Sequence, residues 1–286
     1  MNPKLILGLA FGFASALIWG GHAVIARPVL ADGSFSSFDL AAFRYGVGMM
    51  ALVPFAWAAR ATLLRLGLRR ILLLALFGGA PNLMLFLVAL VYAPASHGGT
   101  IGPMTAPIVG AILAIPLLKE WPTQGRALAL GAMVMGVLMI GWDGVMGDYP
   151  GAWRGDLLLM ASGATWAVFT LLLRRWQVPA IPATAAITIV SGLAILPFWL
   201  PMRAAEVFAM PAGLVLGCVA MFFFARAVEL LGATRAATLS VMVPVVALLL
   251  AGLWLREPLS LLQILGAGLA VAGMLAAVLF TGRKSA

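Results

Sequence analysis

Among long apolar runs, the chain carries a few polar and aromatic side chains whose spacing could form a binding surface. Ser15, Trp19 and His22 follow one another at intervals of four and three residues, so on a helix they share one face. Such a face offers hydrogen bonds and a ring for stacking, and polar groups at membrane depth are costly enough to be functional candidates. The alternative is structural, with Trp19 packed between helices and His22 near the lipid headgroups. We take all three as candidate substrate-binding residues.

Amide and aromatic side chains in other runs extend this candidate surface. Asn82 follows Pro81, and Phe86 lies one turn further along the same helix face. An amide in an apolar run needs a partner because it carries both donors and acceptors, and that partner is either a substrate or a neighbouring helix. Trp166 and Phe169 stand in a later run, and we expect them to face the same space.

Three further candidates lie along one predicted helix, and one comes from an aromatic run. His97, Thr100 and Met104 share a face of the run that begins at residue 96. His97 stands near the outer end of that run, where it fits a solvated turn residue as well as a ligand. The residues 222–224 are three phenylalanines, so at least one ring faces inward, and we select Phe223.

Two prolines and one charged pair are candidates for moving parts. Pro107 and Pro244 each remove a helical hydrogen bond and so permit a bend, which predicts hinges, although membrane helices also tolerate proline generally. Arg226 and Glu229 are three residues apart, a spacing typical of a structural pair on one helix. A cytoplasmic gate is the alternative interpretation of this pair.

The sequence lacks the motifs of enzymatic chemistry. It contains no glycine-rich phosphate loop, no zinc-binding helix with paired histidines and no nucleophile elbow. Two histidines, with no carboxylate pair inside the apolar runs, are a poor basis for acid–base catalysis. The single cysteine, Cys218, excludes an intramolecular disulfide. We therefore expect no catalytic residues, no metal, no cofactor and no enzymatic activity.

The composition requires membrane-spanning helices to position these side chains. Of the 286 residues, 64% are hydrophobic and 9% are charged, and the mean hydropathy is +1.10, whereas a soluble domain carries about 25% charged residues. Each spanning helix needs about 20 apolar residues, so ten would use roughly 200 residues and leave short connections. We predict an all-α polytopic membrane protein with ten transmembrane helices at residues 4–26, 39–58, 70–92, 96–117, 124–142, 156–174, 180–200, 211–229, 233–254 and 260–280.

The basic residues predict the orientation of these spans. They recur in small clusters between the apolar runs and form no contiguous face, so the net charge of +9 does not indicate nucleic-acid binding. If both termini lie in the cytoplasm, 13 of the 18 basic residues fall on the cytoplasmic side. The five on the other side, or nearer to it, are Arg27, Arg44, Arg154, Arg203 and Arg256. This bias follows the positive-inside rule and predicts a multi-pass inner-membrane protein with both termini cytoplasmic.

The chain also contains an internal repeat. Residues 14–19 recur at 161–166, an offset of 147, and residues 118–120 recur at 255–257, an offset of 137 that also relates Pro107 to Pro244. We therefore predict two five-helix repeats, residues 1–143 and 154–282. Because five is odd, the second repeat is inverted relative to the first. Inverted repeats can exchange conformations and so open a central site to one side and then to the other.

The repeated unit resembles the EamA domain of the drug/metabolite transporter superfamily. The resemblance is carried by a first-helix Ala-Ser-x-x-x-Trp, by Ala-Leu-x-Tyr-x-x-Ala-Ser at residues 89–96, by the fourth-helix proline and by the Leu-Lys/Arg-Glu ends. It covers nearly the whole chain, and the second copy departs from it at residues 229–233. The resemblance implies ten helices around a central cavity. Within the family, the chain looks most like the YddG-type exporters of aromatic and other neutral amino acids.

From this resemblance we expect a secondary transporter that exports small neutral metabolites, above all amino acids including aromatic ones, by alternating access. A phosphate substrate would require several converging Lys or Arg residues, which the mid-membrane positions lack. The alternatives are a multidrug or other metabolite exporter of the same superfamily and, further away, a channel or a membrane-embedded enzyme. No Asp or Glu stands out at mid-helix, which favours facilitated diffusion, with His22 and His97 as candidate proton carriers. The expected partners are the lipid bilayer and a small-molecule substrate.

Overall fold

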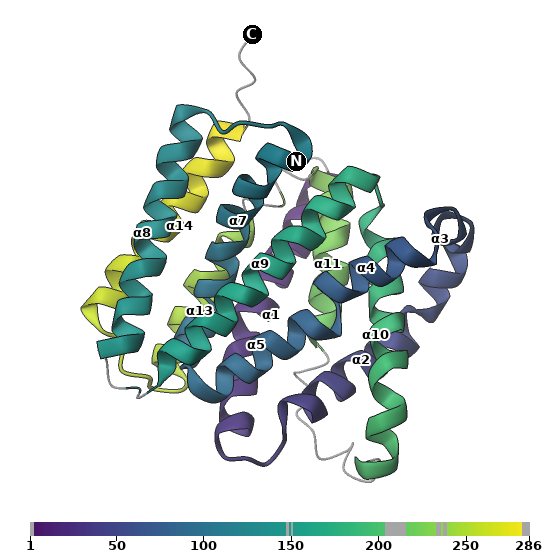
Figure 1. Ribbon diagram of the computed structural model, residues 1–286, viewed down its shortest axis with the longest axis horizontal. Helices are drawn as coiled ribbons and strands as arrows, with labels where there is room; N and C mark the ends of the chain where they lie inside the picture. Colours follow the sequence, from purple (N-terminus) through teal and green to yellow (C-terminus); the bar gives the residue numbers. More distant parts are fainter. Residues whose placement is uncertain are drawn as a thin grey trace.

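The described part of the chain is helical throughout. The computed structural model describes residues 3–146, 149, 151–203, 216–232, 236 and 239–281, and these residues contain no strand (Figure 1). The helices are α1 (Pro3–Ala31), α2 (Ser37–Ala58), α3 (Arg60–Leu66), α4 (Leu68–Gly78), α5 (Ala80–Tyr92), α6 (Ala95–Gly98), α7 (Ile101–Leu118), α8 (Gln124–Met146), α9 (Ala152–Trp176), α10 (Ala180–Arg203), α11 (Leu216–Leu231), α13 (Met242–Leu253) and α14 (Leu261–Thr281). Helices suit such apolar runs because a backbone inside lipid must satisfy its hydrogen bonds within the segment.

Eight helical stretches among the described residues are long and apolar enough to cross a bilayer. They are α1, α2, α4 with α5, α6 with α7, α8, α9, α10 and α14. Helix α13 is apolar but has 12 residues, and α11 has 16. The predicted starts of the eighth and ninth spans, at residues 211 and 233, lie outside the described residues. The count of ten spans therefore stays a prediction.

The span predicted at residues 70–92 is broken in its middle. The backbone of Gly79 leaves the helical region at φ −102° and ψ −141°, and α5 begins at the next residue. The N–H of Ala80 donates to Oγ of Ser191 on α10 at 2.9 Å, and a side chain at Gly79 would collide with that hydroxyl. The break is thus stabilised by a hydrogen bond to a side chain of a neighbouring helix, as backbone groups freed inside a membrane require.

A second predicted span, residues 96–117, is also divided. Helix α6 is separated from α7 at Gly99 and Thr100. The methyl group of Ala247 on α13 occupies the space that a side chain at Gly99 would need. Helix α3 is an addition that the hydropathy pattern did not predict, because its arginines interrupt the apolar run after α2.

Helices from the first half of the sequence pack against helices from the second half. Helix α1 packs against α11 and α13, α9 against α5 and α7, α2 against α10, and α8 against α14 (Figure 1). The α8–α14 contact is closest at small residues: a side chain at Gly136 would meet the carbonyl oxygen of Gly266, and one at Gly273 would meet that of Ala129. Small residues let membrane helices approach at the level of their backbones.

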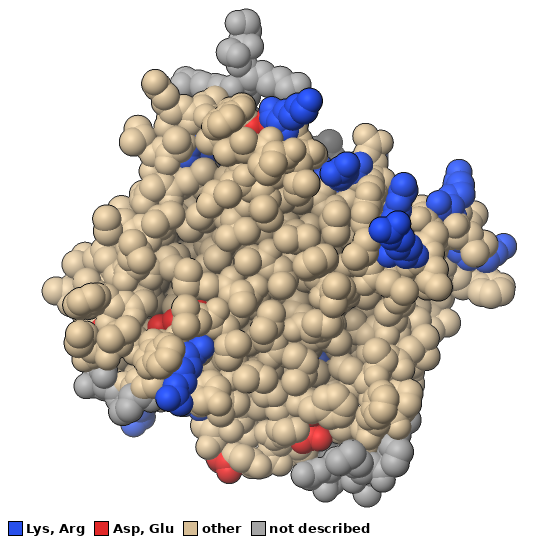
Figure 2. Space-filling model, viewed as in Figure 1, with Lys and Arg blue, Asp and Glu red and all other residues tan. Residues whose placement is uncertain are grey.

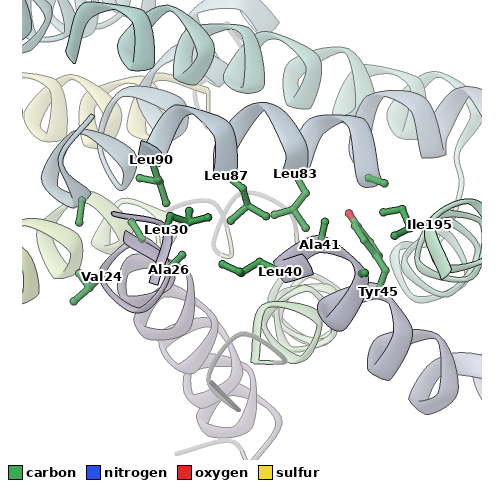
Figure 3. Packing of buried hydrophobic residues seen from close by; sticks show 14 of the residues in the cluster. Val24, Ala26, Leu30, Leu40, Ala41, Tyr45, Leu83, Leu87, Leu90 and Ile195 are labelled. Atoms are coloured by element: carbon green, nitrogen blue, oxygen red, sulfur yellow. The ribbon is translucent and has the colours of Figure 1, made fainter. Parts of the chain in front are cut away.

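An apolar core fills the space between α1, α2, α5 and α10. Figure 3 shows Leu30 of α1, Leu40 and Tyr45 of α2, Leu87 of α5 and Ile195 of α10 packed together. A further apolar cluster joins α7, α8, α9 and α14, and another joins α4, α9, α10 and α11.

Large apolar side chains also cover the outside of the molecule. Trp57, Phe198 and Leu253 are 71%, 70% and 78% exposed. Figure 2 shows a largely uncharged middle on the viewed face, with most of the visible Lys and Arg towards its upper and right edges and a smaller group at the lower left. The start of α1 and the end of α14 lie at the upper end in the same view (Figure 1). An exposed apolar surface of this extent fits contact with lipid tails.

Candidate functional site

Two tryptophans from distant parts of the chain meet between the helices. The rings of Trp19 on α1 and Trp166 on α9 pack edge to face, with centroids 6.1 Å apart and an interplanar angle of 82°. Phe224 of α11 packs on Trp19 at 5.3 Å, and Phe169 packs on Trp166 at 4.9 Å. We call these four residues the aromatic cluster. Phe169 is buried and the other three are half-buried, so part of their ring surface stays open.

The amide of Asn82 ties α5 to α9 beside this cluster. Its Nδ2 donates to the carbonyl oxygen of Ser162 and to Oγ1 of Thr165, both at 2.7 Å. Thr165 directly precedes Trp166, so these bonds hold the turn that carries the tryptophan ring. Of the two kinds of partner that the sequence allowed, the neighbouring helix is present. The Oδ1 atom of Asn82 has no hydrogen-bond partner among the described residues.

The break between α4 and α5 lies next to the aromatic cluster. A side chain at Gly78, the last residue of α4, would collide with the ring of Phe169. Helix α5 begins two residues later, near the middle of the apolar stretch Leu68–Tyr92. The amino end of a helix carries a partial positive charge. A partly positive helix end and the aromatic rings are therefore neighbours at mid-span.

His22 and Phe86 pack together, as their predicted faces allow. Their ring centroids are 5.4 Å apart, and His22 is buried. Arg44 of α2 is also buried and interacts electrostatically with His22. The sequence did not single out Arg44, because an arginine near the start of a membrane helix is typical of a side chain that extends to the surface.

Ser15 and Phe223 are directed elsewhere. The hydroxyl of Ser15 donates to the carbonyl oxygen of Gly12 in its own helix at 3.0 Å. Phe223 packs on Phe11 at 5.2 Å, while its neighbour Phe224 contacts Trp19. The phenylalanine that contacts the tryptophans is thus Phe224, the residue after Phe223, which the sequence analysis selected. Three successive phenylalanines cover every side of a helix, so the pattern alone does not choose among them.

Thr100 and Met104 belong to a different packed region. The Thr100 hydroxyl donates to the carbonyl oxygen of Ser96 at 2.7 Å and is buried. Met104 is fully buried in the apolar cluster that joins α7, α8, α9 and α14. Their role in substrate binding stays a prediction.

The two candidate hinge prolines occupy different helical positions. Pro107 lies inside α7, where it removes a hydrogen bond of the helix interior. Pro244 is the third residue of α13, within the first turn, where backbone N–H groups have no partner inside the helix. The structure thus offers a reason for bending at Pro107 more directly than at Pro244.

The candidate gate pair is formed. Nη1 of Arg226 donates to Oε2 of Glu229 at 2.6 Å on the same helix, and both side chains are more than one third exposed. This is the structural pair that the spacing indicated. Its role as a gate stays a prediction.

His97 is buried and hydrogen-bonded, and it is not solvated. Its Nδ1 lies 2.7 Å from Oδ1 of Asp156, and its Nε2 lies 2.5 Å from Nε2 of Gln263 and 4.0 Å from Oδ2 of Asp143. We call these four residues the His97 cluster. The sequence missed it because both aspartates stand at the ends of predicted spans, where carboxylates are ordinarily solvated. Gln263, a polar residue inside an apolar run, was the signal available.

The two Leu-Lys/Arg-Glu ends make different contacts. Glu257 accepts hydrogen bonds from the backbone N–H groups of Ala95 and Ser96 at 2.7 and 2.9 Å, which caps α6. Glu120, its counterpart in the first copy, binds Arg174 through both carboxylate oxygens at 2.8 and 2.5 Å in an exposed position. Neither contact was predicted, because each joins residues far apart in the sequence.

The fold and site define a polytopic helical membrane protein whose polar groups are gathered between its helices. The chain belongs to the EamA-like transporter family, whose sequence profile matches residues 6–142 and 153–279. It is therefore a transporter of the drug/metabolite transporter superfamily, in agreement with the resemblance found in the sequence.

Comparison with individual proteins gives the same class. The chain is 26% identical over 276 residues to YwfM of Bacillus subtilis (strain 168), an uncharacterized transporter, and the match covers 93% of this chain and 91% of that protein. A protein of known crystal structure shares the fold with a TM-score of 0.63, at 20% identity, over 98% of both chains.

Proposed function

We propose that this EamA-family chain exports small neutral metabolites across the inner membrane, with amino acids including aromatic ones as its substrates. The contact of Trp19 with Trp166 carries this proposal. Partly exposed rings from two helices far apart in the sequence meet there, and an aromatic substrate could pack against them. An aromatic pair contributes about 0.5–1.5 kcal/mol of stabilisation beyond the burial of its surface area. The resemblance to YddG-type exporters points to the same substrates.

The polar groups beside the rings suit a zwitterion. Oδ1 of Asn82 can accept a hydrogen bond from an ammonium group, and the amino end of α5 favours a carboxylate through its partial positive charge. Broken membrane helices present their ends to substrates in this manner in other transporters. A phosphate would require several cations, and the aromatic cluster, Asn82 and its partners Ser162 and Thr165 include no Lys or Arg.

We propose further that the chain consists of two inverted five-helix repeats, residues 1–143 and 154–282, arranged as ten spans around a central cavity. The packing of the helices supports this. In the two proposed repeats, α1 is equivalent to α9, α5 to α11 and α7 to α13. The contact of α1 with α11 is then equivalent to that of α9 with α5, and the contact of α1 with α13 to that of α9 with α7. The α2–α10 and α8–α14 contacts are each converted into themselves, as a two-fold axis between the repeats requires.

Contacts between small residues support the same relation. The offset of 137 residues relates Gly136 to Gly273 and Ala129 to Gly266. The contact of Gly136 with Gly266 is therefore equivalent to that of Gly273 with Ala129, and in both the helix backbones approach closely. Lys119 and Arg256, which the offset also relates, have nearly the same left-handed backbone, with φ of 56° and 54°. Two copies of one inverted unit can exchange conformations, which is the basis of alternating access.

The surface charges support cytoplasmic termini. Arg60 and Arg65 on α3, and Arg174 and Arg175 at the end of α9, are all exposed. Figure 1 places α3 and the end of α9 towards the upper part of the view, as it does the start of α1, and Figure 2 shows Lys and Arg along the upper and right edges in the same view. Basic residues favour the cytoplasmic side.

The experiment that tests the proposal is counterflow in proteoliposomes that contain the purified protein. Labelled phenylalanine, threonine and methionine are supplied outside, with and without the same compound inside. Saturable uptake stimulated by internal substrate is the expected result, and a channel would show no such stimulation.

A multidrug exporter of the same superfamily is the competing function, because open aromatic rings also stack on planar drugs. Flat traces for all three amino acids from folded protein, together with counterflow of a planar cationic dye, would replace the amino acid proposal with this one.

A further inference from the structure

Four polar side chains from four helices converge in the His97 cluster. His97 comes from α6, Asp143 from α8, Asp156 from α9 and Gln263 from α14. His97, Asp156 and Gln263 are 1%, 4% and 2% exposed. Buried ionisable groups are costly in a membrane protein and therefore mark functional positions. The substrate site proposed above uses none of the aspartates and does not include Gln263.

With the Gln263 amide in its present orientation, the contacts indicate which nitrogen of His97 carries the ring proton. An amide nitrogen can only donate, so Nε2 of Gln263 donates to Nε2 of His97 at 2.5 Å. Nδ1 of His97 therefore carries the proton and donates to Oδ1 of Asp156 at 2.7 Å. In this arrangement the imidazole is neutral. Oδ2 of Asp156 and Oε1 of Gln263 are buried without a hydrogen-bond partner among the described residues.

The same cluster can accept one more proton with little rearrangement. Turning the Gln263 amide by half a rotation exchanges its nitrogen and oxygen positions. Its Oε1, which otherwise lacks a partner, would then accept a hydrogen bond from a protonated Nε2 of His97. The resulting imidazolium would lie 2.7 Å from Asp156 and 4.0 Å from Asp143, and both carboxylates would stabilise its charge.

We propose that the His97 cluster is a proton-binding site that couples transport to protonation. The proton binds at Nε2 of His97, the N–H···N bond from Gln263 is replaced by an N–H···O bond to it, and no other covalent or hydrogen bond changes. This proposal departs from the facilitated diffusion that the sequence favoured, since the carboxylate expected of a proton-coupled carrier is present at Asp156.

The charged surroundings of His97 are few. The helices packed against α6 are α1, α5, α7, α9 and α13, and neither α7 nor α13 carries a titratable side chain. The titratable or charged groups at this end of the structure include Asp156 and Arg154 on α9, Asp143 on α8, His22 and Arg27 on α1, Tyr92 on α5, Tyr149 before α9, and Arg256 and Glu257 before α14. Among these, only the two aspartates are found within 4.0 Å of the imidazole.

The position of the cluster supplies the coupling. His97 lies in the first stretch that the family profile matches, and Asp156 and Gln263 lie in the second. Movement of α6 relative to α9 or α14 must change at least one of these hydrogen bonds, so proton binding favours one conformation over another. Asp156 also lines a groove of about 400 Å³ with Gly141, Val145 and Trp153, which brings the buried carboxylate close to the surface.

Nuclear magnetic resonance of the imidazole nitrogens tests proton binding without any transported compound. The chain has two histidines, so His22→Gln leaves His97 as its only histidine. In ¹⁵N-histidine-labelled protein in lipid nanodiscs, we expect Nδ1 protonated and Nε2 bare at high pH, and a proton on both nitrogens at low pH. Subtracting the spectrum of His97→Gln from that of the unaltered protein gives the same signals without the His22 change. One charge state throughout, or a neutral ring protonated at Nε2, would overturn the proposal.

A second arm tests coupling and rests on the proposed amino acid transport. A gradient of one pH unit supports at most about tenfold accumulation of phenylalanine for each proton exchanged. We expect gradient-driven accumulation in the unaltered protein and a much smaller accumulation in Asp156→Asn, which lacks the carboxylate that stabilises the bound proton and retains counterflow at equal pH. Equal gradient effects in both proteins would overturn the coupling. If phenylalanine is not transported, the proposed substrate fails, while the nitrogen spectra still decide proton binding.

Discussion

Trp19 and Trp166 contact each other although 147 residues separate them in the sequence. They are also the matching residues of the two recurring segments. Equivalent residues of two units related by a two-fold axis can touch each other only where the axis passes between them. The contact therefore puts the proposed axis between these two rings. A site that both repeats share equally would lie at this point.

Two neighbouring rings on α11 provide a matched test of this position. Phe224 contacts Trp19, whereas Phe223 contacts Phe11. We expect Phe224→Ala to lower the rate of phenylalanine counterflow by about fivefold, because one lost aromatic contact is worth about 1 kcal/mol. Phe223→Ala should leave the rate within about twofold. Equal effects of the two changes would argue against the aromatic cluster as the substrate site.

The amide of Asn82 should contribute to stability as well as to binding. Asn82→Ala and Thr165→Val each remove one partner of the 2.7 Å bond between α5 and α9. A double-mutant cycle is expected to give a coupling energy of about 0.6–1.7 kcal/mol. Thr170→Val is the control, since that hydroxyl bonds only within α9. Thermal unfolding in detergent measures all four variants, and additive effects of Asn82→Ala and Thr165→Val would contradict the bond.

The α8–α14 contact should not tolerate one added methyl group. A Cβ at Gly136 would collide with the carbonyl oxygen of Gly266 and with Ala270, so Gly136→Ala should destabilise the protein by about 1–3 kcal/mol. Gly131 lies in the same helix with open space around it. Gly131→Ala should be neutral or stabilising by up to about 1 kcal/mol, through helix propensity. The order of the two melting temperatures is the readout, and a Gly136→Ala variant as stable as Gly131→Ala would disprove the close approach.

The two motif glutamates should differ in their effect on stability. Glu257 caps two backbone N–H groups of α6, so Glu257→Ala should cost about 1–2 kcal/mol. The pair of Glu120 with Arg174 is exposed, and Glu120→Ala should cost about 0–1 kcal/mol. Urea or thermal unfolding distinguishes these values. A larger loss for Glu120→Ala would show that its pair is more important than the cap.

The class of protein could be predicted from the sequence because composition and apolar run length directly report a lipid environment. The repeat could be detected because both copies kept the Ala-Ser-x-x-x-Trp segment, which also located Trp19 and Trp166. The break at Gly79 could not be predicted. Its compensation comes from Ser191, 111 residues away, and no local pattern reports such a partner.

The candidate site was predicted in part for a similar reason. Periodicity predicts which side chains share a helix face, but it does not define which neighbouring helix each face meets. Asn82 thus contacts α9, and Phe224 takes the position expected of Phe223. The His97 cluster was missed because its members come from four helices, and each of them looks ordinary in its own segment.

Equilibrium binding of phenylalanine to the purified protein tests the central claim most directly. It compares the unaltered protein with Trp19→Ala, and Trp57→Ala, an exposed tryptophan on α2, serves as the control. We predict saturable binding that is weakened at least about tenfold by Trp19→Ala, which corresponds to about 1.4 kcal/mol, and unchanged by Trp57→Ala. Equal affinity in all three proteins, with melting temperatures showing that each is folded, would contradict a substrate site between Trp19 and Trp166.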